Sequence, residues 1–211
     1  MLYSFCPGGG DICSDGNGPE RGVTFDRSGN LYGTTAGGGN AFLAGVLYKL
    51  TPSSGGWTET VLYNFPVRKN WRNDPGPVTI DPHGRLYTTL TSFFTNYSNG
   101  VVARLNTNGS IELFRFNGTD GRGPSSGVVV DTSRGVLYGT TDSSLFGPGN
   151  VFQIDTSDQE SVLYTFCQQS DCTDGDVPGG LVEDKLGNLY GTTGNGGNQG
   201  EGYGVVFEIT P

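Results

Sequence analysis

Side chains that could bind a ligand or a metal ion gather in the loops that follow a recurring Leu-Tyr-x-Phe pattern or a close variant of it. Asp15, Asp120 and Asp174 stand in three of these loops. Ca²⁺ prefers carboxylate and amide oxygens, so these residues predict ligand binding, with Ca²⁺ as the one cofactor to consider, although none has EF-hand spacing. The alternative is structural, because a loop Asp often accepts backbone N–H groups and fixes a turn.

A second candidate site is the segment 66–72, which interrupts the repeat described below. Arg68, Lys69 and Arg72 supply three cations, and Trp71 adds an aromatic ring, in an otherwise acidic chain. Cations pair with anionic groups, and aromatic and guanidinium planes stack on ligands. The segment therefore predicts binding of an anionic or sugar ligand. The alternative is a Trp that plugs its own loop, beside solvated charges.

Residues for nucleophilic catalysis are scarce. His83 is the only histidine, and it falls in a predicted Asp-Pro-His-Gly turn. A Ser-His-Asp or Cys-His system is therefore disfavoured, and we assign no catalytic residue. The sequence favours a non-catalytic binding or adhesion module for a glycan or surface polymer. Two alternatives stay open: an enzyme that acts on a polysaccharide or small molecule through carboxylates or tyrosine, and a structural subunit of a surface assembly.

Composition excludes several classes of protein. The net charge of −9 disfavours a nucleic-acid-binding protein, which needs a basic face. Glycine, at 37 of 211 residues, disfavours a helical protein, whereas 12 Phe and 10 Tyr provide enough apolar surface for a core and argue against disorder. No apolar run approaches the ~20 residues of a membrane-spanning helix. We expect a monomer or a homo-oligomer with no membrane span.

Four elements recur in register through four copies. Each is short, rich in Val, Ile, Leu, Tyr, Phe and Thr, and bounded by Gly, Pro, Asn and Asp, which indicates a β-strand. In chain order within a copy they lie at 23–26, 78–81, 128–131 and 181–184; at 31–35, 86–89, 137–141 and 189–193; at 45–50, 100–105, 149–154 and 204–209; and, for the lead-in Leu-Tyr-x-Phe strand, at 2–5, 62–65, 113–116 and 163–166.

Four-stranded units of roughly 50 residues predict an all-β fold, a four-bladed β-propeller of four-stranded antiparallel blades. We place residues 1–211 in one domain, with blades at about 19–65, 77–116, 124–166 and 178–211 plus 1–5. The strand at 23–26 and its counterparts would be innermost and buried on both faces. The N-terminal strand would pair with residues 204–209 and close the ring, which removes an exposed edge. The alternative is an open half-ring that dimerises into eight blades.

The repeat resembles the GloVer-type tandem repeat, also called choice-of-anchor tandem-repeat proteins. The shared motifs are Asp-x-x-Gly-Asn-Leu-Tyr-Gly-Thr-Thr, Gly-x-Val-Phe-x-Ile-Thr-Pro and Leu-Tyr-x-Phe-Cys, and they cover nearly the whole chain. The second copy departs most, since Thr88 replaces Gly and Arg85 replaces Asn. The resemblance implies an extracellular β-propeller. It implies no established activity and assigns no catalytic residue.

Cysteine spacing indicates an oxidising compartment. Cys6 and Cys13 share one loop, and Cys167 and Cys172 share another, so two local disulfides are expected; a zinc site is the alternative. Three glycosylation sequons begin at Asn96, Asn108 and Asn117. Together these features predict a secreted or cell-surface protein, and a glycoprotein if the host glycosylates it.

Overall fold

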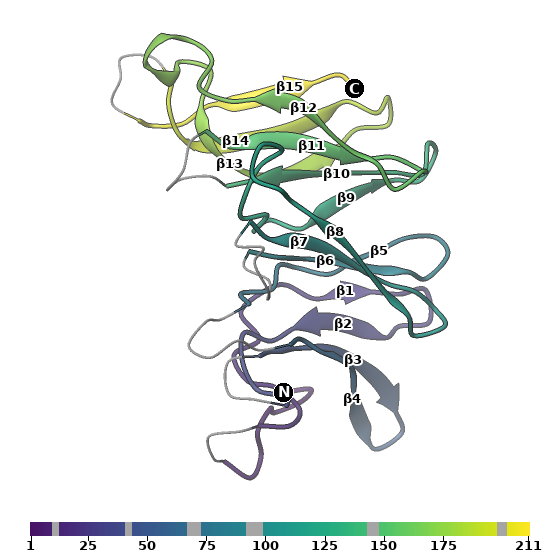
Figure 1. Ribbon diagram of the computed structural model, residues 1–211. Helices are drawn as coiled ribbons and strands as arrows, with labels where there is room; N and C mark the ends of the chain where they lie inside the picture. The colour runs from purple at the N-terminus through teal and green to yellow at the C-terminus, as the bar shows by residue number, and fades with distance from the viewer. Residues whose placement is uncertain (10–12, 41–43, 67–72, 92–98, 143–147, 198–201) are drawn as a thin grey trace.

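The structure, a computed structural model, describes residues 1–9, 13–40, 44–66, 73–91, 99–142, 148–197 and 202–211. Four antiparallel sheets lie side by side in chain order, and the two chain ends lie at opposite ends of this stack (Figure 1). The first sheet contains β1 (Thr24–Phe25), β2 (Leu31–Thr34), β3 (Val46–Ser53) and β4 (Gly56–Asn64), in that order.

The next two sheets repeat this four-stranded meander, and the last sheet has three strands. The second sheet contains β5 (Thr79–Ile80), β6 (Leu86–Leu90), β7 (Val101–Leu105) and β8 (Ile111–Arg115). The third contains β9 (Val128–Asp131), β10 (Val136–Thr141), β11 (Asn150–Ile154) and β12 (Glu160–Thr165). The last contains β13 (Asp176–Glu183), β14 (Leu189–Asn195) and β15 (Val206–Ile209). The predicted all-β repeat architecture is therefore confirmed.

Apolar cores lie between successive sheets. Side chains alternate between the two faces of a strand, so the third strand of each sheet sends one residue toward the following sheet. These residues are buried in clusters with residues of the next sheet: Leu47 with Leu86, Val102 with Val128, and Val151 with Leu189. Each inner sheet is thereby buried on both faces, which fixes the stack.

Asp-x-x-Gly turns join the first two strands of the first, second and last sheets, and the third sheet uses a turn that is one residue longer, from Asp131 to Gly135. The Asp accepts backbone N–H groups of its turn; for example, Asp26 Oδ1 accepts Ser28 N at 2.8 Å. Its other oxygen accepts the Tyr hydroxyl in three copies: Asp26–Tyr32 at 3.1 Å, Asp81–Tyr87 at 3.2 Å and Asp184–Tyr190 at 3.2 Å. The hydroxyl of each of these three Tyr side chains therefore has a hydrogen-bond acceptor in the turn beside it.

The expected closure of the ring by hydrogen bonds is not observed in this structure. Residues 1–5 form no strand, and the last sheet ends at β15 without a fourth member. The N-terminal segment lies instead on the first sheet, where the Phe5 ring packs edge to face on Tyr48 at 4.9 Å. This contact keeps residues 1–5 at the far end of the stack from β15 (Figure 1).

The innermost strands are also more exposed than predicted. Val23 and Phe25 are 49% and 64% exposed, and Val182 of the last sheet is 65% exposed. Val78 of the second sheet is buried as expected. In an open stack the inner edge has no opposing blade across a central channel, so these side chains meet solvent. No helix in the described ranges has the length and apolar character to cross a membrane.

Candidate functional site on the long-loop face

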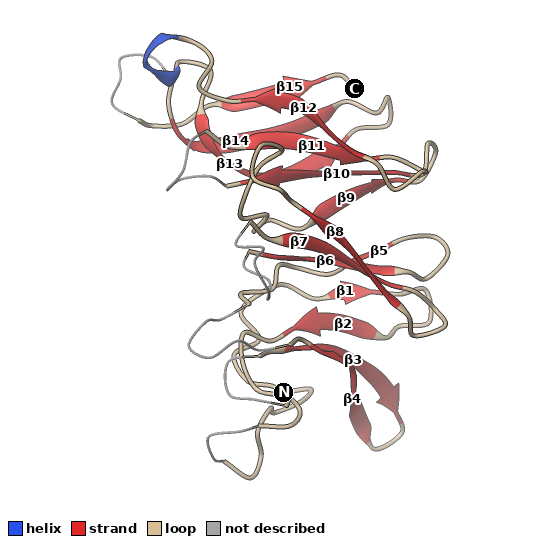
Figure 2. Ribbon diagram, in the orientation of Figure 1, coloured by secondary structure: helices blue, strands red, loops and turns tan. Residues whose placement is uncertain are grey.

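The longer described loops gather along one edge of the stack, which we call the long-loop face. It includes residues 5–9, 13–22 and 166–175, with the short 3₁₀ helix η1 (Ser170–Cys172) shown in blue in Figure 2. The turns within the sheets, such as the β3–β4 turn, lie along the opposite edge (Figure 2). All three predicted ligand-binding aspartates belong to loops of the long-loop face.

Asp15 fixes the first of these loops. Its carboxylate accepts the Tyr3 hydroxyl at 2.9 Å and Cys6 N at 3.0 Å, while the Cys6–Cys13 disulfide closes the loop covalently. Burial and the hydrogen bond to Asp15 raise the pKa of Tyr3 to about 12. Tyr3 therefore stays a neutral donor across the physiological range, and the loop is held in one conformation.

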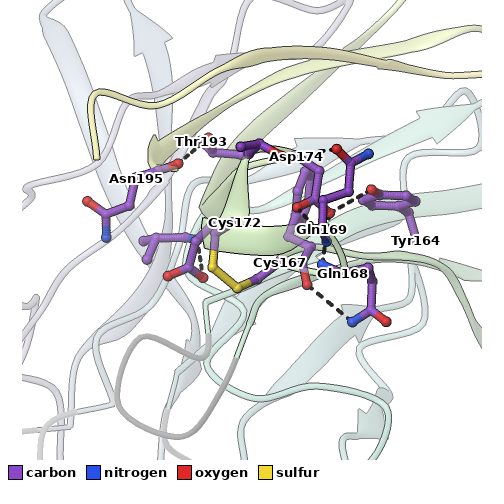
Figure 3. The surroundings of a disulfide bond; sticks show 12 residues. Tyr164, Cys167, Gln168, Gln169, Cys172, Asp174, Thr193 and Asn195 are labelled. Carbon is purple, nitrogen blue, oxygen red and sulfur yellow. Dashed lines mark hydrogen bonds between the residues drawn. A yellow bond between two sulfur atoms is a disulfide. The ribbon is translucent and has the colours of Figure 1, made fainter. Parts of the chain in front are cut away.

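Asp174 does the same in the fourth copy (Figure 3). Its carboxylate accepts the Tyr164 hydroxyl at 2.8 Å and Gln168 N at 3.0 Å, beside the Cys167–Cys172 disulfide. Burial opposes ionisation of Asp174, but the bonds from Gln168 N and the Tyr164 hydroxyl outweigh it and lower the pKa of Asp174. Both predicted disulfides are therefore present, and each loop has a matching carboxylate.

Asp120 also caps its own loop, by accepting Asn117 N at 2.8 Å and Gly118 N at 3.1 Å. In all three copies the aspartate is thus engaged within its loop. The structure does not bring the three together: each lies beside a different sheet. Within the described residues no group of three or more His, Cys, Asp or Glu side chains is placed to hold a metal ion.

A hollow of about 350 Å³ opens beside the first disulfide. We call it the Cys6 hollow; its lining residues are Tyr3, Cys6, Pro7, Gly8, Gly9, Cys13, Ser14 and Asp15. Ser14 is exposed, and no atom would crowd a side chain placed on Gly8. A phenol, a hydroxyl, a carboxylate and open backbone therefore converge on one concave surface.

Two carboxylates that sequence reasoning missed lie on the fourth strands of the first and third sheets. Burial and, second, the charge of Asp15 raise the pKa of Glu59 to about 7. Burial and Asp120 do the same for Glu160, whose pKa is also about 7. One oxygen of each is buried without a hydrogen bond among the described residues. The available signal was their shared position in the repeat, opposite Leu50 of β3 and Ile154 of β11.

The remaining predicted site residues are the basic segment and the three sequon asparagines. Arg68, Lys69, Trp71 and Arg72 lie outside the described residues, as does the sequon at Asn96. Asn108 and Asn117 are exposed; the side-chain oxygen of Asn108 accepts the Ser110 hydroxyl at 2.7 Å, and that of Asn117 accepts the Thr119 hydroxyl at 2.6 Å. Their use as glycan acceptors stays a prediction.

Comparison with solved structures identifies the fold class of this stack of antiparallel sheets. The chain is similar to virginiamycin B lyase from Staphylococcus aureus (TM-score 0.58, 14% identity, 92% of this chain and 56% of that chain). It is also similar to a luciferin-regenerating enzyme (0.55, 16%, 89% and 61%) and to a protein assigned as a gluconolactonase (0.54, 16%, 90% and 63%). The chain thus spans less than two thirds of each of these chains. They are propeller-like proteins, so the fold is that of a β-propeller repeat protein.

The family follows from the sequence itself. The Gloeobacter/Verrucomicrobia repeat family matches residues 18–211, and the chain belongs to that family. The expected GloVer-type resemblance is therefore confirmed. No curated protein matches the chain.

Proposed function

We propose that this protein is a non-catalytic, extracellular binding or adhesion module that recognises a glycan or surface polymer through its long-loop face. The observation that carries the proposal is the Cys6 hollow, a concave surface in a loop that is fixed by a disulfide and by Asp15.

Rigidity of the loop supports binding. The disulfide joins residues seven positions apart, and the Tyr3–Asp15 and Cys6–Asp15 bonds hold the two ends of the loop together. A loop that is ordered before the ligand arrives loses less conformational entropy on binding. Disulfides of this kind persist in oxidising compartments, which supports secretion or display at the cell surface.

The chemistry of the lining supports a hydroxyl-rich ligand. The Ser14 hydroxyl both donates and accepts hydrogen bonds, the Asp15 carboxylate accepts them, and open backbone at Gly8 and Gly9 offers further polar groups. Ligand sites combine such convergent polar groups with apolar surface, which Tyr3 and Pro7 supply here. The basic segment with Arg68, Lys69, Trp71 and Arg72 is proposed as a second contact for an anionic polymer.

The test is a polysaccharide and surface-polymer array followed by titration calorimetry of the hits. Ser14→Trp would fill the Cys6 hollow, and we expect it to weaken binding at least tenfold. Thr173→Trp is the matched control, because Thr173 precedes Asp174 as Ser14 precedes Asp15. The control should bind like the unmodified protein. Absence of any hit, or an equal loss in both variants, would contradict the proposal.

An enzyme is the second candidate, and the raised pKa values of Glu59 and Glu160 favour it. A carboxyl group that is still partly protonated near neutral pH can act as a general acid, and a neighbouring ionised carboxylate can act as the base or nucleophile. Under this candidate, turnover on a glycoside or lactone panel would be lost in Glu160→Gln and kept in Thr173→Trp. No turnover on any substrate of the panel would remove it.

A further inference from the structure

Two residues that set the second copy apart from the rest of the repeat line the same hollow. Arg85 replaces the asparagine of the first and last copies, Asn30 and Asn188, and His83 is the only histidine of the chain. The hollow, of about 260 Å³, opens between the second and third sheets on the edge that carries the turns within the sheets, which we call the short-turn edge (Figure 2). We call it the Arg85 hollow, and its polar lining includes His83, Arg85, Tyr87, Arg104, Asp155 and Asp158.

The Arg85 guanidinium caps its own turn and still has donors to offer. The asparagines of the first and last copies donate Nδ2 to their turn aspartates, at 2.6 and 3.0 Å. Arg85 Nε makes the corresponding bond to Asp81 Oδ2, and its guanidinium lies 5.9 Å from the centre of the Tyr87 ring. The two terminal nitrogens of Arg85 make no hydrogen bond among the described residues. The side chain is 35% exposed, so a positioned planar fork is open to a carboxylate.

The β11–β12 turn supplies an acceptor to the same hollow. Arg104 is already committed, because its terminal nitrogens donate to both oxygens of Asp158, at 2.9 and 3.0 Å, and to Glu112. Asp155 Oδ1 accepts Ser157 N at 2.8 Å, whereas Asp155 Oδ2 accepts no hydrogen bond within the part of the chain that the structure describes. The Arg85 hollow therefore combines a cationic fork with a carboxylate oxygen that can accept a hydroxyl.

A second hollow, of about 450 Å³, adjoins the first and shares His83 with it. It lies between the β1–β2 and β5–β6 turns, and Phe25, Ile80 and Pro82 form its apolar lining. Phe25 is 64% exposed, so its ring is available to pack against the apolar face of a ligand ring. The His83 imidazole has no hydrogen-bond partner among the described residues, and it stands where a ligand in one hollow would pass to the other.

We propose that the short-turn edge binds an acidic oligosaccharide, with the carboxylate of one uronic acid residue on the Arg85 fork and the neighbouring sugar over Phe25. Hydroxyl groups of the uronic acid would donate to Asp155 Oδ2 and accept from His83. The Arg85 hollow lies just below the roughly 300–1,000 Å³ of sites for drug-sized ligands, as suits one monosaccharide. This site goes beyond the proposed function, which places a ligand in the Cys6 hollow on the opposite edge.

Charge favours an acidic glycan over a nucleic acid at this edge. Asp81, Asp155 and Asp158 accompany the cations of the Arg85 hollow, and the whole chain carries a net charge of −9. Binding of a polyphosphate backbone depends on a strongly positive surface. A uronic acid residue brings one carboxylate together with several hydroxyl groups, which matches a hollow that contains both donors and acceptors.

The test is titration calorimetry of the full chain with a galacturonic acid tetrasaccharide and with its methyl ester, which keeps the sugar rings but removes their charge. Arg85→Asn restores the residue of the first and last copies, so the turn stays capped while the fork is lost. We expect Arg85→Asn to weaken binding of the acid about tenfold or more, because a charged bidentate contact is removed. The methyl ester should bind the unmodified chain with a similar loss. Lys185→Asn, at an exposed cation in the corresponding turn of the last sheet, is the matched control and should bind like the unmodified chain.

A second variant tests the neighbouring hollow. Phe25→Ala should weaken binding of the tetrasaccharide roughly fivefold, since it removes the stacking ring. It should leave binding of monomeric galacturonic acid, followed by NMR titration, unchanged, because the monomer fills only the Arg85 hollow. Ser14→Trp in the Cys6 hollow should change neither affinity, which separates failure of this inference from failure of the proposed function.

Several outcomes would overturn the inference, with every variant first shown to be folded by circular dichroism. Absence of binding at millimolar tetrasaccharide removes it. Equal affinity for the acid and its methyl ester shows that Arg85 receives no carboxylate. Binding that survives Arg85→Asn but is lost in Ser14→Trp moves the ligand to the Cys6 hollow. Tighter Arg85-dependent binding of single-stranded DNA or polyglutamate assigns the edge to another class of partner.

Discussion

The ring of Phe166 meets the ring of Phe207 edge to face, with 4.9 Å between centroids and an interplanar angle of 62°. Phe166 directly follows β12 of the third sheet, and Phe207 lies on β15, the third strand of the last sheet. This one contact therefore ties two neighbouring sheets together. Because Phe166 is 1% exposed, its ring contributes both burial and aromatic packing to the sheet-to-sheet core.

Phe166→Ala should destabilise the fold by about 3–5 kcal/mol, the usual cost of deleting a fully buried aromatic ring. Phe5→Ala removes the corresponding ring from the half-buried N-terminal position and should cost roughly 1–2 kcal/mol. Urea unfolding followed by fluorescence measures both, at a protein concentration low enough to exclude association. Equal losses in the two variants would show that Phe5 is as fully packed as Phe166.

Local residue patterns account for the sheets, and they could not account for closure. Strand residues and turn residues such as Asp26 and Gly29 act within a few positions, so the four-fold repeat predicts four antiparallel meanders. Ring closure depends instead on the tilt between neighbouring sheets, which side-chain volumes at residues such as Leu47 and Val102 set together. A small change in the angle between neighbouring sheets, added over successive interfaces, is enough to separate residues 2–5 from β15.

The candidate site was predictable to a similar extent. The cysteine spacing correctly predicts both disulfides, and the three aspartates lie in loops, as their position after the lead-in pattern indicates. Their role depends on which donors return to them, and Tyr3 meets Asp15 from twelve positions away. Glu59 and Glu160 share a position in the repeat, but their burial could not be predicted from it, because burial of a carboxylate on an outer strand is a property of tertiary packing.

Tyr164→Phe should destabilise the fold by about 1 kcal/mol at neutral pH, since it removes the hydrogen bond to the partly buried carboxylate of Asp174. The pKa of Asp174 is lowered in the folded protein, so its stabilising effect is full above the unfolded pKa and is lost as the pH falls through the folded pKa. The gap between variant and parent should therefore shrink in acid. Urea titrations at several pH values measure it.

The control for this prediction is Tyr48→Phe. The Tyr48 hydroxyl makes no hydrogen bond among the described residues, although its ring is buried. Loss of the Tyr48 hydroxyl should leave the free energy of unfolding nearly unchanged at every pH. A Tyr48→Phe effect as large as that of Tyr164→Phe would assign the cost to ring packing and not to the hydrogen bond with Asp174.

Gly175→Ala should cost roughly 2–4 kcal/mol. Gly175 follows Asp174 with φ at 101°, and a Cβ there would lie 2.7 Å from Thr193 Cγ2. Gly109 has a similar positive φ of 83° but open space around it, so Gly109→Ala should lose only about 1 kcal/mol from backbone strain. The difference between the thermal unfolding midpoints of the two variants measures the steric part of the destabilisation at Gly175. Equal midpoints would mean that the loop shifts to accept the methyl group.

Glu160→Gln should stabilise the protein at alkaline pH. Burial and Asp120 raise the folded-state pKa of Glu160 to about 7, whereas the unfolded chain titrates near the ordinary Glu value. The folded state therefore resists ionisation, so this group reduces stability progressively as the pH rises between those two values. Because the side chain is partly solvated, we expect a gain of roughly 1 kcal/mol at pH 8 and none at pH 4. Glu112→Gln should do the opposite and destabilise the protein as the pH rises, since hydrogen bonds from Asn106 and Arg104 lower the pKa of Glu112 and the variant keeps only one acceptor oxygen in place of two. Urea unfolding across this pH range distinguishes the two, and a Glu160→Gln effect that does not change with pH would show that the carboxyl group is already ionised in the folded protein.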